Sequence, residues 1–292
     1  MSGGIAIIGY ASLDHVAMLD SVPRPGRTST ILARPERAWP RLGGSPAYVA
    51  GALAAAGVAD ARPVSWIGDD KAGDAYLQQL RDGGILVDAM ARVPGARTPM
   101  AILAYDPDGG CSCLYDPGMP KDLTLTAAQQ AVVAGADWLC VTIGPTGPTR
   151  AALDALRPDA RLAWVVKDDP RALPSDLAAR IAARADLVCH SRAERGFLQA
   201  ALEAAPGARA DRILIETRGG EGAVATCGGR SLAVPTSDFD TPDPTGAGDT
   251  FAGGVLAALV QGQGDLGAAV EAGHKAAAAL LRGRQTPVNE SA

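Results

Sequence analysis

The chain has 292 residues, 47% of them hydrophobic and 20% charged, with a formal net charge of −5 at pH 7. That length can bury a full core as one large α/β domain or as two small ones. The acidic balance argues against a surface for nucleic acid or for an anionic membrane. No run approaches the roughly 18 apolar residues of a membrane span, and the first residues lack the cationic start of a signal peptide. We therefore expect a cytoplasmic protein whose partners are small molecules, with no nucleic acid and no membrane among them.

The five cysteines, at positions 111, 113, 140, 189 and 227, show no repeated spacing. Cys111-x-Cys113 is too tight and too isolated to supply a tetrahedral zinc set. We expect free thiols in a reducing compartment.

The first part of the chain combines clear strand signals with a stretch that has none. Residues 5–8 (IAII) predict a buried strand that ends in a turn at Gly9. Over residues 20–41, scattered prolines without a helical period predict loops and short edge strands. Residues 97–116 predict a hairpin whose turn is Asp108-Gly109-Gly110. Between these, the pattern predicts a small-residue helix over 46–57, a strand over 63–67 and a helix over 72–81.

From residue 138 onward, strands and helices alternate, which predicts a parallel sheet covered by helices. Because no repeat or low-complexity linker divides the chain, we expect one domain over 1–292. Two segments of different character, about 14–42 and 95–118, would form a small lid on the α/β body. The expected strands are 138–143, 162–166, 187–190, 213–217, 224–225 and 232–234, and the expected helices begin at 148 and then cover 175–184, 192–203, 247–261 and 266–282.

The most informative segment is Asp243-Pro-Thr-Gly246-Ala247-Gly248-Asp249. Gly246, Ala247 and Gly248 stand where a loop becomes a helix, so their backbone N–H groups point outward with the positive end of the helix dipole. Small side chains let an anion approach that backbone. Asp249 follows in the first helical turn, where it could accept a proton from a hydroxyl that attacks a phosphoryl group. The alternative interpretation of Asp249 is an N-terminal helix cap.

This string resembles the C-terminal signature D-x-x-G-A-G-D of the ribokinase (PfkB) family of carbohydrate and nucleoside kinases, and Phe251-Ala-Gly-Gly supplies the small-residue helix that follows it. The resemblance implies a ribokinase-like α/β fold, a mostly parallel sheet flanked by helices, with a small β-rich lid. It implies ATP as phosphoryl donor with Mg²⁺, Asp249 as catalytic base and the 246–248 backbone as anion hole. A monovalent cation near this loop is common in the family, although the sequence assigns it no ligands.

The family also carries acceptor-binding motifs near its N-terminus. The stretch from Gly9 to Asp14 resembles the first strand and the aspartate that binds substrate hydroxyls, and a carboxylate can accept two hydrogen bonds from a vicinal diol. Asp14 could equally be a turn or cap residue. Gly43-Gly44-Ser-Pro-Ala resembles the N-terminal signature, in which glycines let backbone approach the acceptor. Tyr48 stands where that signature usually carries Asn. Its phenol either replaces the amide contact and stacks on a base or ring of the acceptor, or it packs within its helix.

A second departure is Ser191-Arg-Ala-Glu194, where the family has N-x-x-E after a strand. The resemblance makes Glu194 the acid that helps to order Mg²⁺ and its waters. Ser191 and Glu194 could also form a helix capping box, and the two roles can coexist.

Thr217-Arg-Gly-Gly220-Glu-Gly222 resembles the T-x-G-x-x-G nucleotide loop of the family, with Arg218 either a phosphate partner or a solvated loop residue. Lys167 ends a predicted strand at the carboxyl edge of the sheet, where open α/β sheets bind ligands. His274 is either a nucleotide contact or an ordinary helix-surface residue. The predicted nucleotide-binding residues are Lys167, Ser191, Thr217, Arg218, Gly220, Gly222, Gly246, Gly248 and His274.

The sequence therefore predicts an ATP-dependent kinase that phosphorylates a hydroxyl of a sugar or sugar derivative. The alternatives are a nucleoside kinase of the same family and a non-catalytic ligand-binding member. No Walker A string, no G-x-G-x-x-G after the first strand and no G-x-S-x-G elbow supports another ATPase, an oxidoreductase or a hydrolase. An unpaired edge strand in the lid would favour a homodimer formed through the lids.

Overall fold

The structure is a computed structural model that describes residues 4–34, 39–205, 207, 209, 211–236, 241 and 243–284. Its body is a nine-stranded sheet in which seven neighbouring strands are parallel and two edge strands continue antiparallel. In spatial order the strands are β14 (Arg230–Val234), β13 (Ala223–Cys227), β12 (Ile213–Thr217), β11 (Leu187–Ser191), β10 (Arg161–Val165), β9 (Trp138–Val141), β1 (Ile5–Ile8), β5 (Ala61–Gly68) and β6 (Met90–Val93).

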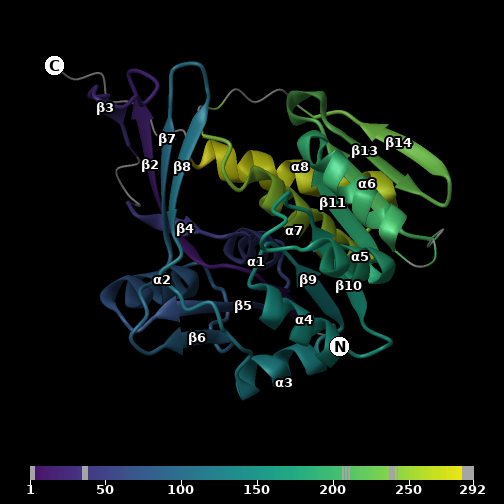
Figure 1. Cartoon of the computed structure of the whole chain (residues 1–292). Helices are drawn as coiled ribbons and strands as arrows, with labels where there is room; N and C mark the ends of the chain where they lie inside the picture. The colour runs from purple at the N-terminus through teal and green to yellow at the C-terminus, as the bar shows by residue number, and fades with distance from the viewer. Residues whose placement is uncertain are drawn as a thin grey trace.

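Helices cover both faces of this sheet (Figure 1). On one face lie α1 (Ser45–Ala55), α2 (Lys71–Asp82), α7 (Ala247–Val260) and α8 (Leu266–Arg282), and on the other α3 (Ala127–Gly135), α4 (Thr146–Ala155), α5 (Ser175–Arg184) and α6 (Arg195–Ala204). Successive residues of β1 enter the two cores in turn, because strand side chains alternate between faces. Burial on both faces explains why these strands read as continuous apolar runs. In the described part of the chain, no helix is both long and apolar enough to cross a membrane.

Small residues bring three helices of the first face unusually close together. A Cβ atom added to Gly253 of α7 would lie 2.7 Å from Ala52 of α1, and one added to Gly273 of α8 would lie 2.8 Å from the Phe251 ring. The abundance of Gly and Ala is therefore used for close packing, which leaves little freedom for α7 to shift. The position of the residues at the start of α7 is fixed by this packing.

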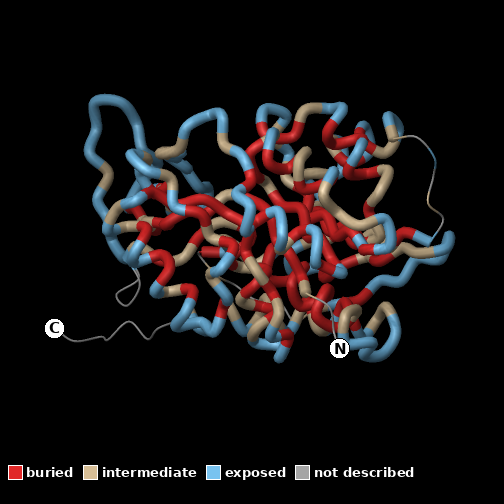
Figure 2. Tube along the Cα trace, turned by 90° about the horizontal axis from the view of Figure 1, so that it is seen from below, coloured by how far each residue is buried: buried red, intermediate tan, exposed pale blue. Residues whose placement is uncertain are grey.

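A second sheet stands beside the body, with the order β3 (Ile31–Ala33), β2 (Ser12–Leu19), β7 (Met100–Tyr105) and β8 (Cys111–Asp116), and β4 (Arg41–Gly43) also pairs with β2. The predicted hairpin is confirmed, since β7 and β8 are antiparallel. Figure 2 shows buried chain filling the middle of the body. In the second sheet, β3 and β8 are largely exposed, whereas β2 is mostly buried. The expected β-rich, lid-like unit exists. We call this second sheet the lid sheet.

Three elements were not predicted, namely β2, β6 and α3. The four residues of β6 include an exposed Arg92, which interrupts the apolar run. The short helix α3 begins with a capping box in which Thr126 accepts a hydrogen bond from the Gln129 amide. The predicted helix over 192–203 is divided into a 3₁₀ turn at Arg192–Glu194 and α6. All five cysteines are free, as expected.

Candidate active site

Asp249 lies in the first turn of α7, and its side chain is 8% exposed. The N-cap of the helix is Gly246 in the left-handed conformation (φ 75°), and no side chain caps it, so the interpretation of Asp249 as a cap is wrong. Within the described residues, Oδ1 of Asp249 is buried and has no hydrogen-bond partner. The positively charged Nζ of Lys167 lies 3.6 Å from the same oxygen. A buried acceptor left in this state is costly unless a ligand completes it.

The three residues before Asp249 differ in what their amides can offer. The N–H group of Ala247 donates to the carbonyl of Pro244 at 3.0 Å, so it is used by the turn itself. Over the described ranges, the backbone amides of Gly246 and Gly248 donate to no protein acceptor. A Cβ atom at Gly248 would meet nothing within 4 Å. Within the described chain, the backbone therefore offers two unused donors, and only Gly248 adjoins open space, where the sequence predicted an anion hole of three residues.

Lys167 stands two residues beyond the end of β10, at the carboxyl edge of the sheet. Attraction to Asp249 raises its pKa above the ordinary value despite its partial burial, and Glu194 adds to the effect. Lys167 therefore stays protonated at neutral pH, stabilised by the negative charges of Asp249 and Glu194. The structure thus brings together three predicted residues from separate segments of the chain, namely Lys167, Glu194 and Asp249.

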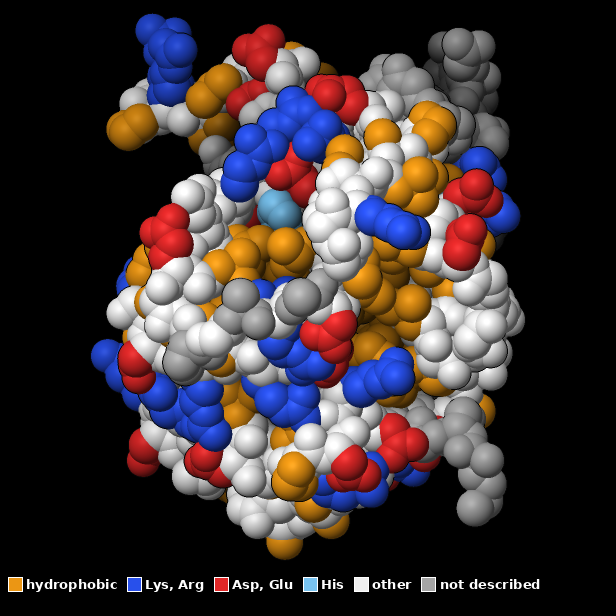
Figure 3. All heavy atoms as spheres, turned by 90° about the vertical axis from the view of Figure 1, so that its right-hand side faces the viewer, with side chains coloured by type: hydrophobic (Ala, Val, Ile, Leu, Met, Phe, Trp, Pro, Cys, Tyr) orange, Lys and Arg blue, Asp and Glu red, His pale blue; other side chains and the backbone are white. Residues whose placement is uncertain are grey.

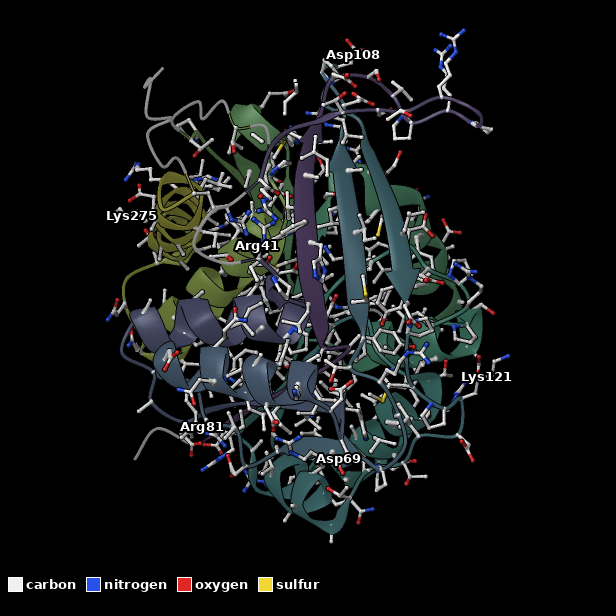
Figure 4. The ribbon with its side chains drawn as sticks, turned by 90° about the vertical axis from the view of Figure 1, so that its left-hand side faces the viewer. Arg41, Asp69, Arg81, Asp108, Lys121 and Lys275 are labelled. Atoms are coloured by element: carbon white, nitrogen blue, oxygen red, sulfur yellow. The ribbon has the colours of Figure 1, made fainter. Side chains whose placement is uncertain are left out.

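Asp243, at the start of the same loop, is surrounded by cations. Its carboxylate accepts two hydrogen bonds from Arg41, at 2.5 and 3.1 Å, and both side chains are buried. Figure 4 places Arg41 in the interior, between the lid sheet and the last two helices. Nη1 of Arg284 donates to the carbonyls of Asp243 and Thr245 at 3.2 and 2.6 Å. Burial alone would raise the pKa of Asp243, but Arg41 and Arg284 bring it below the usual range.

Sequence reasoning missed Arg41 and Arg284. Arg41 belongs to β4, two residues before the glycines of the N-terminal motif, and Arg284 follows the last helix. Their common partner is 202 residues from Arg41 and 41 residues from Arg284. No local pattern in the sequence could have shown that they meet, because neither belongs to a motif.

Asp14 lies on β2 with 4% exposure and accepts a hydrogen bond from Ser12 at 2.8 Å. Burial raises its pKa, against the opposing effects of Ser12 and of Arg41, which faces Asp14 in the β2–β4 register. A Cβ atom at Gly43 would lie 2.2 Å from the Asp14 carboxyl carbon. Gly44, with φ 83°, is the N-cap of α1. Gly43 therefore allows close approach of β4 to Asp14, and Gly44 allows close approach to the Tyr10 carbonyl. Because Asp14 lies within β2, it is neither a turn nor a cap residue.

Tyr48 projects from α1 onto the loop at the start of α7. A Cβ atom at Gly246 would fall within 2.5–2.6 Å of three carbons of its ring, so the ring lies directly against that glycine. The phenol oxygen accepts a hydrogen bond from Nη2 of Arg284 at 3.3 Å, and burial raises the pKa of Tyr48 to about 12. Tyr48 therefore does more than pack within its helix, because it supports the loop. The ring face against Gly246 is not available for stacking on a ligand.

Six of the nine predicted nucleotide-binding residues lie at or just after the ends of three neighbouring strands, β10, β11 and β12. The Ser191 amide donates to Oε2 of Glu194 at 2.7 Å, so the capping interaction is present. Thr217 donates through Oγ1 to the carbonyl of His190 at 3.3 Å. Gly220 lies in the exposed 3₁₀ turn Gly219–Glu221, and Gly222 (φ 89°) ends it.

Arg218 is not a simple solvated residue. Its Nε donates to Oε1 of Glu216 at 2.6 Å, and Glu216 also accepts two hydrogen bonds of 2.7 Å from Arg195. These bonds and charges, against the effect of partial burial, lower the pKa of Glu216 to about 2. The guanidinium of Arg218 is therefore held by Glu216 at the carboxyl end of β12.

His274 lies on α8 with its ring 5.2 Å from the ring of Phe251, and desolvation lowers its pKa. Its Nδ1 is buried and lacks a hydrogen-bond partner in the part of the chain that the structure describes. Helix α8 packs on β13 and β14. Figure 3 shows hydrophobic side chains gathered in a recess on the face of the molecule that carries these elements, with basic side chains around it.

The described residues contain no group of three or more His, Cys, Asp or Glu that could hold a metal ion by itself. Magnesium commonly takes one or two carboxylates and completes its shell with water and substrate phosphate. Glu194 and Asp249, both close enough to influence Lys167, fit such a site. They do not form an all-protein cage.

A family model for pfkB family carbohydrate kinases matches residues 3–290, nearly the whole chain. The chain belongs to the pfkB family of carbohydrate kinases. It is accordingly a phosphotransferase with a hydroxyl acceptor, of a family whose substrates are sugar-like. The family recognised from the Asp243–Asp249 string is confirmed.

This pfkB family member is similar over most of its length to named kinases. It is 27% identical over 277 residues to an ATP-dependent ribose-1-phosphate kinase of Halopiger xanaduensis, covering 95% of this chain and 91% of that one. It is 28% identical over 278 residues to a fructokinase of Klebsiella pneumoniae, covering 89% and 85%. A putative ribokinase II from E. coli, solved with ATP and Mg²⁺, has a TM-score of 0.76 at 18% identity, covering 96% and 92%. This last likeness confirms the predicted fold.

Proposed function

We propose that this protein transfers the γ-phosphoryl group of ATP, with Mg²⁺, to a hydroxyl of a sugar or sugar derivative, and that Asp249 is the catalytic base. The observation that carries the proposal is the buried Oδ1 of Asp249, which has no hydrogen-bond partner in the described chain. It lies beside the free amides of Gly246 and Gly248. An acceptor hydroxyl would supply the missing hydrogen bond.

In the reaction, the acceptor hydroxyl gives its proton to Asp249 as its oxygen forms a bond to the γ-phosphorus. The bond between that phosphorus and the β–γ bridging oxygen breaks, and ADP leaves with the electron pair. Charge on the transferred group is stabilised by the amides of Gly246 and Gly248 and by the positive end of α7. Lys167, 3.6 Å from Asp249, supplies a positive charge on the nucleotide side.

The acceptor would bind between the lid sheet and the body. Asp14 offers a carboxylate on the lid strand β2, and Gly43 lies in contact with it. Tyr115 of β8 shares a face of the lid sheet with Asp14, because both are register partners of Ala101. Its ring centroid is 6.5 Å from that of Tyr10, at the end of the first strand. Carboxylate and aromatic side chains on adjacent surfaces suit a polyhydroxylated ring.

The nucleotide would lie along the carboxyl ends of β10 to β12, with its base toward the apolar recess of Figure 3. Thr217, Gly220 and Gly222 provide a narrow backbone loop there. Arg218, held by Glu216, belongs to that loop, and His274 lies on α8, which packs on β13 and β14. Magnesium, when bound with ATP, neutralises phosphate charge, and Glu194 would hold it through water.

We also infer that two copies pair through their lid sheets. Ile102 and Leu114 are cross-strand neighbours on one face of that sheet, and they are 38% and 65% exposed. Ile31 and Leu32 on the edge strand β3 are 51% and 67% exposed. Exposed apolar residues along open strand edges are typical of a surface that pairs with a second copy. A solution mass equal to one chain would refute this.

The direct test is ADP release from ATP and Mg²⁺ with a panel of hexoses, pentoses, pentose phosphates, sugar acids and nucleosides. We expect turnover with at least one sugar or sugar derivative, and none when EDTA removes Mg²⁺. The surface variant Arg180→Ala, whose partner Asp154 is also exposed, is the matched control and should behave as wild type. Turnover with nucleosides alone would establish the nucleoside kinase instead. Ligand-induced stabilisation without ADP release would indicate a binding protein.

A further inference from the structure

The guanidinium of Arg284 lies among oxygen atoms of the loop that leads into α7. Its Nη1 donates to the carbonyl oxygens of Thr245 and Asp243, at 2.6 and 3.2 Å, and lies 3.6 Å from Oδ2 of Asp243. The Arg284 side chain is 15% exposed. Two backbone carbonyls and a carboxylate that face one point are the kind of ligands that a bound cation takes in proteins. Here the point is occupied by a cation that belongs to the chain.

Two further contacts hold the same guanidinium in place. Its Nη2 donates to the Tyr48 phenol at 3.3 Å, and its central carbon is 5.7 Å from the centroid of the Tyr48 ring. That distance allows a cation–π attraction. The ring in turn lies directly against Gly246, one of the two residues with a free amide. Arg284 therefore contacts the loop on its carbonyl side and, through Tyr48, supports it at the glycine.

We propose that Arg284 serves as a built-in cation for the 243–246 loop and makes a bound monovalent cation unnecessary. Backbone carbonyls that face inward need a positive or hydrogen-bonding partner, and the guanidinium supplies both. The oxygens of this loop do not fit an additional alkali ion, because Arg284 already takes them and Arg41 takes the carboxylate of Asp243. Arg284 is a positioning residue, since it orients the amides of Gly246 and Gly248 without contacting the reacting atoms.

A purely structural arginine would differ from a built-in cation in one measurable way. Its loss would lower stability in all salts alike, whereas the loss of a built-in cation leaves a group of oxygens that a free cation can fill. The distinguishing measurement is the unfolding midpoint of the protein without substrates, in KCl and in tetramethylammonium chloride at equal ionic strength. Tetramethylammonium is too large and too weakly coordinating to take the place of a potassium ion.

We expect wild type and the surface control Arg180→Ala to unfold at the same temperature in the two salts. In tetramethylammonium chloride, Arg284→Ala should unfold at a lower temperature than wild type. Potassium or millimolar guanidinium should raise the unfolding midpoint of this variant. At ten times the Kd of the cation, the rise should be about 3–6 °C. Arg284→Lys, which keeps the charge, should show a smaller response to potassium than the alanine variant.

Potassium-specific stabilisation of wild type would overturn the proposal, and this result does not require any variant to fold. An Arg284→Ala protein that folds but responds to neither cation would also overturn it. The statement about orienting the amides rests on the proposed function, and its test is the kcat of Arg284→Ala, which added potassium should restore at least about tenfold with KM little changed. Failure of the proposed function would appear separately, as no ADP release from wild type, and would leave the thermal result as it is.

Discussion

Asp243 and Asp249 stand at the two ends of one loop and have the same exposure, with 8% of each side chain accessible. Their surroundings are nevertheless opposite. Asp243 accepts hydrogen bonds from both terminal nitrogens of Arg41 and from the amide of Thr245, and Arg284 lies close by. Asp249 has one cation at 3.6 Å and one oxygen without a hydrogen bond in the described structure. Burial alone therefore does not distinguish a structural carboxylate from a reactive one, but the number of its partners does.

The same contrast extends to the groups around each acid. The Asp243 end is held by side chains from the lid strand β4 and from the segment after α8, two parts of the chain far from the loop in sequence. At the Asp249 end, the preceding residue Gly248 adjoins open space. The loop is thus fixed at one end and left accessible at the other. This arrangement suits a site that acts by positioning and electrostatics, because preorganised groups need no rearrangement during the reaction.

The sharpest test of this contrast replaces each acid by its amide. Asp249→Asn should lower kcat by roughly 10²–10⁴-fold, the usual effect of removing a general base, with an unfolding midpoint near that of wild type. Asp243→Asn should lower the midpoint by roughly 10 °C, because the buried Arg41 loses its counter-charge at a cost on the order of 3–5 kcal/mol. Steady-state kinetics and thermal unfolding of both variants would measure the two effects.

The opposite result for either variant would contradict the roles assigned to these two acids. If Asp249→Asn kept wild-type kcat, Asp249 could not be the base. If Asp243→Asn unfolded at the wild-type temperature, the ion pair with Arg41 would contribute nothing to stability. Circular dichroism at low temperature is the control that both variants are folded before either is assayed.

Gly246 and Gly248 offer a second, smaller test, because replacement of each by alanine should affect stability differently. At Gly248 a methyl group meets no protein atom, so Gly248→Ala should be as stable as wild type or gain about 0.5–1 kcal/mol from helix propensity. The methyl group would occupy space that we assign to the phosphoryl group, so kcat/KM should fall by about 10²-fold. Kinetic assay and chemical denaturation on the same sample separate the two quantities.

Gly246→Ala provides the matched comparison. Its φ of 75° is unfavourable for alanine, and its methyl group would overlap the Tyr48 ring. It should lose about 2–4 kcal/mol of stability as well as activity. Equal stability losses in the two variants would contradict the view that the Gly248 side of the loop is open.

Much of the fold follows from the sequence because its causes are local. Apolar runs bounded by glycine predicted the parallel strands, and the boundaries of α5, α8 and β12 agree with the predicted ranges. The short β6 and α3 were missed, since four and nine residues give too little periodicity to detect. The free state of all five thiols also agrees with prediction.

The candidate site could be predicted only where its residues are consecutive in the sequence and form a motif. The motif from Asp243 to Asp249 gave the loop and helix, and the first strand led to Asp14. Arg41 and Arg284 could not be foreseen, because the partners of a buried ion pair depend on how distant segments pack. Glu216 was likewise missed, although it holds Arg218, since an acid within a buried strand carries no motif.

The pKa shifts of Asp14 and Asp243 predict the smallest effect, a difference in how pH changes stability. Burial raises the pKa of Asp14 above its unfolded value, so its ionisation destabilises the fold as pH rises through the raised pKa. Asp14→Asn should therefore have a higher unfolding midpoint than wild type at pH 8, by roughly 2–4 °C for each kcal/mol recovered, and the gain should shrink as pH falls.

The pKa of Asp243 is lowered, so the stability that its carboxylate contributes is present above its unfolded pKa and is lost as pH falls through its folded pKa. The midpoint deficit of Asp243→Asn should accordingly narrow only in acid, and thermal scans of both variants from pH 8 to pH 3 would show the two trends. A gain for Asp14→Asn that stayed constant down to pH 3 would mean that the Asp14 carboxylate is not destabilised by burial, and would remove the contrast between these two acids.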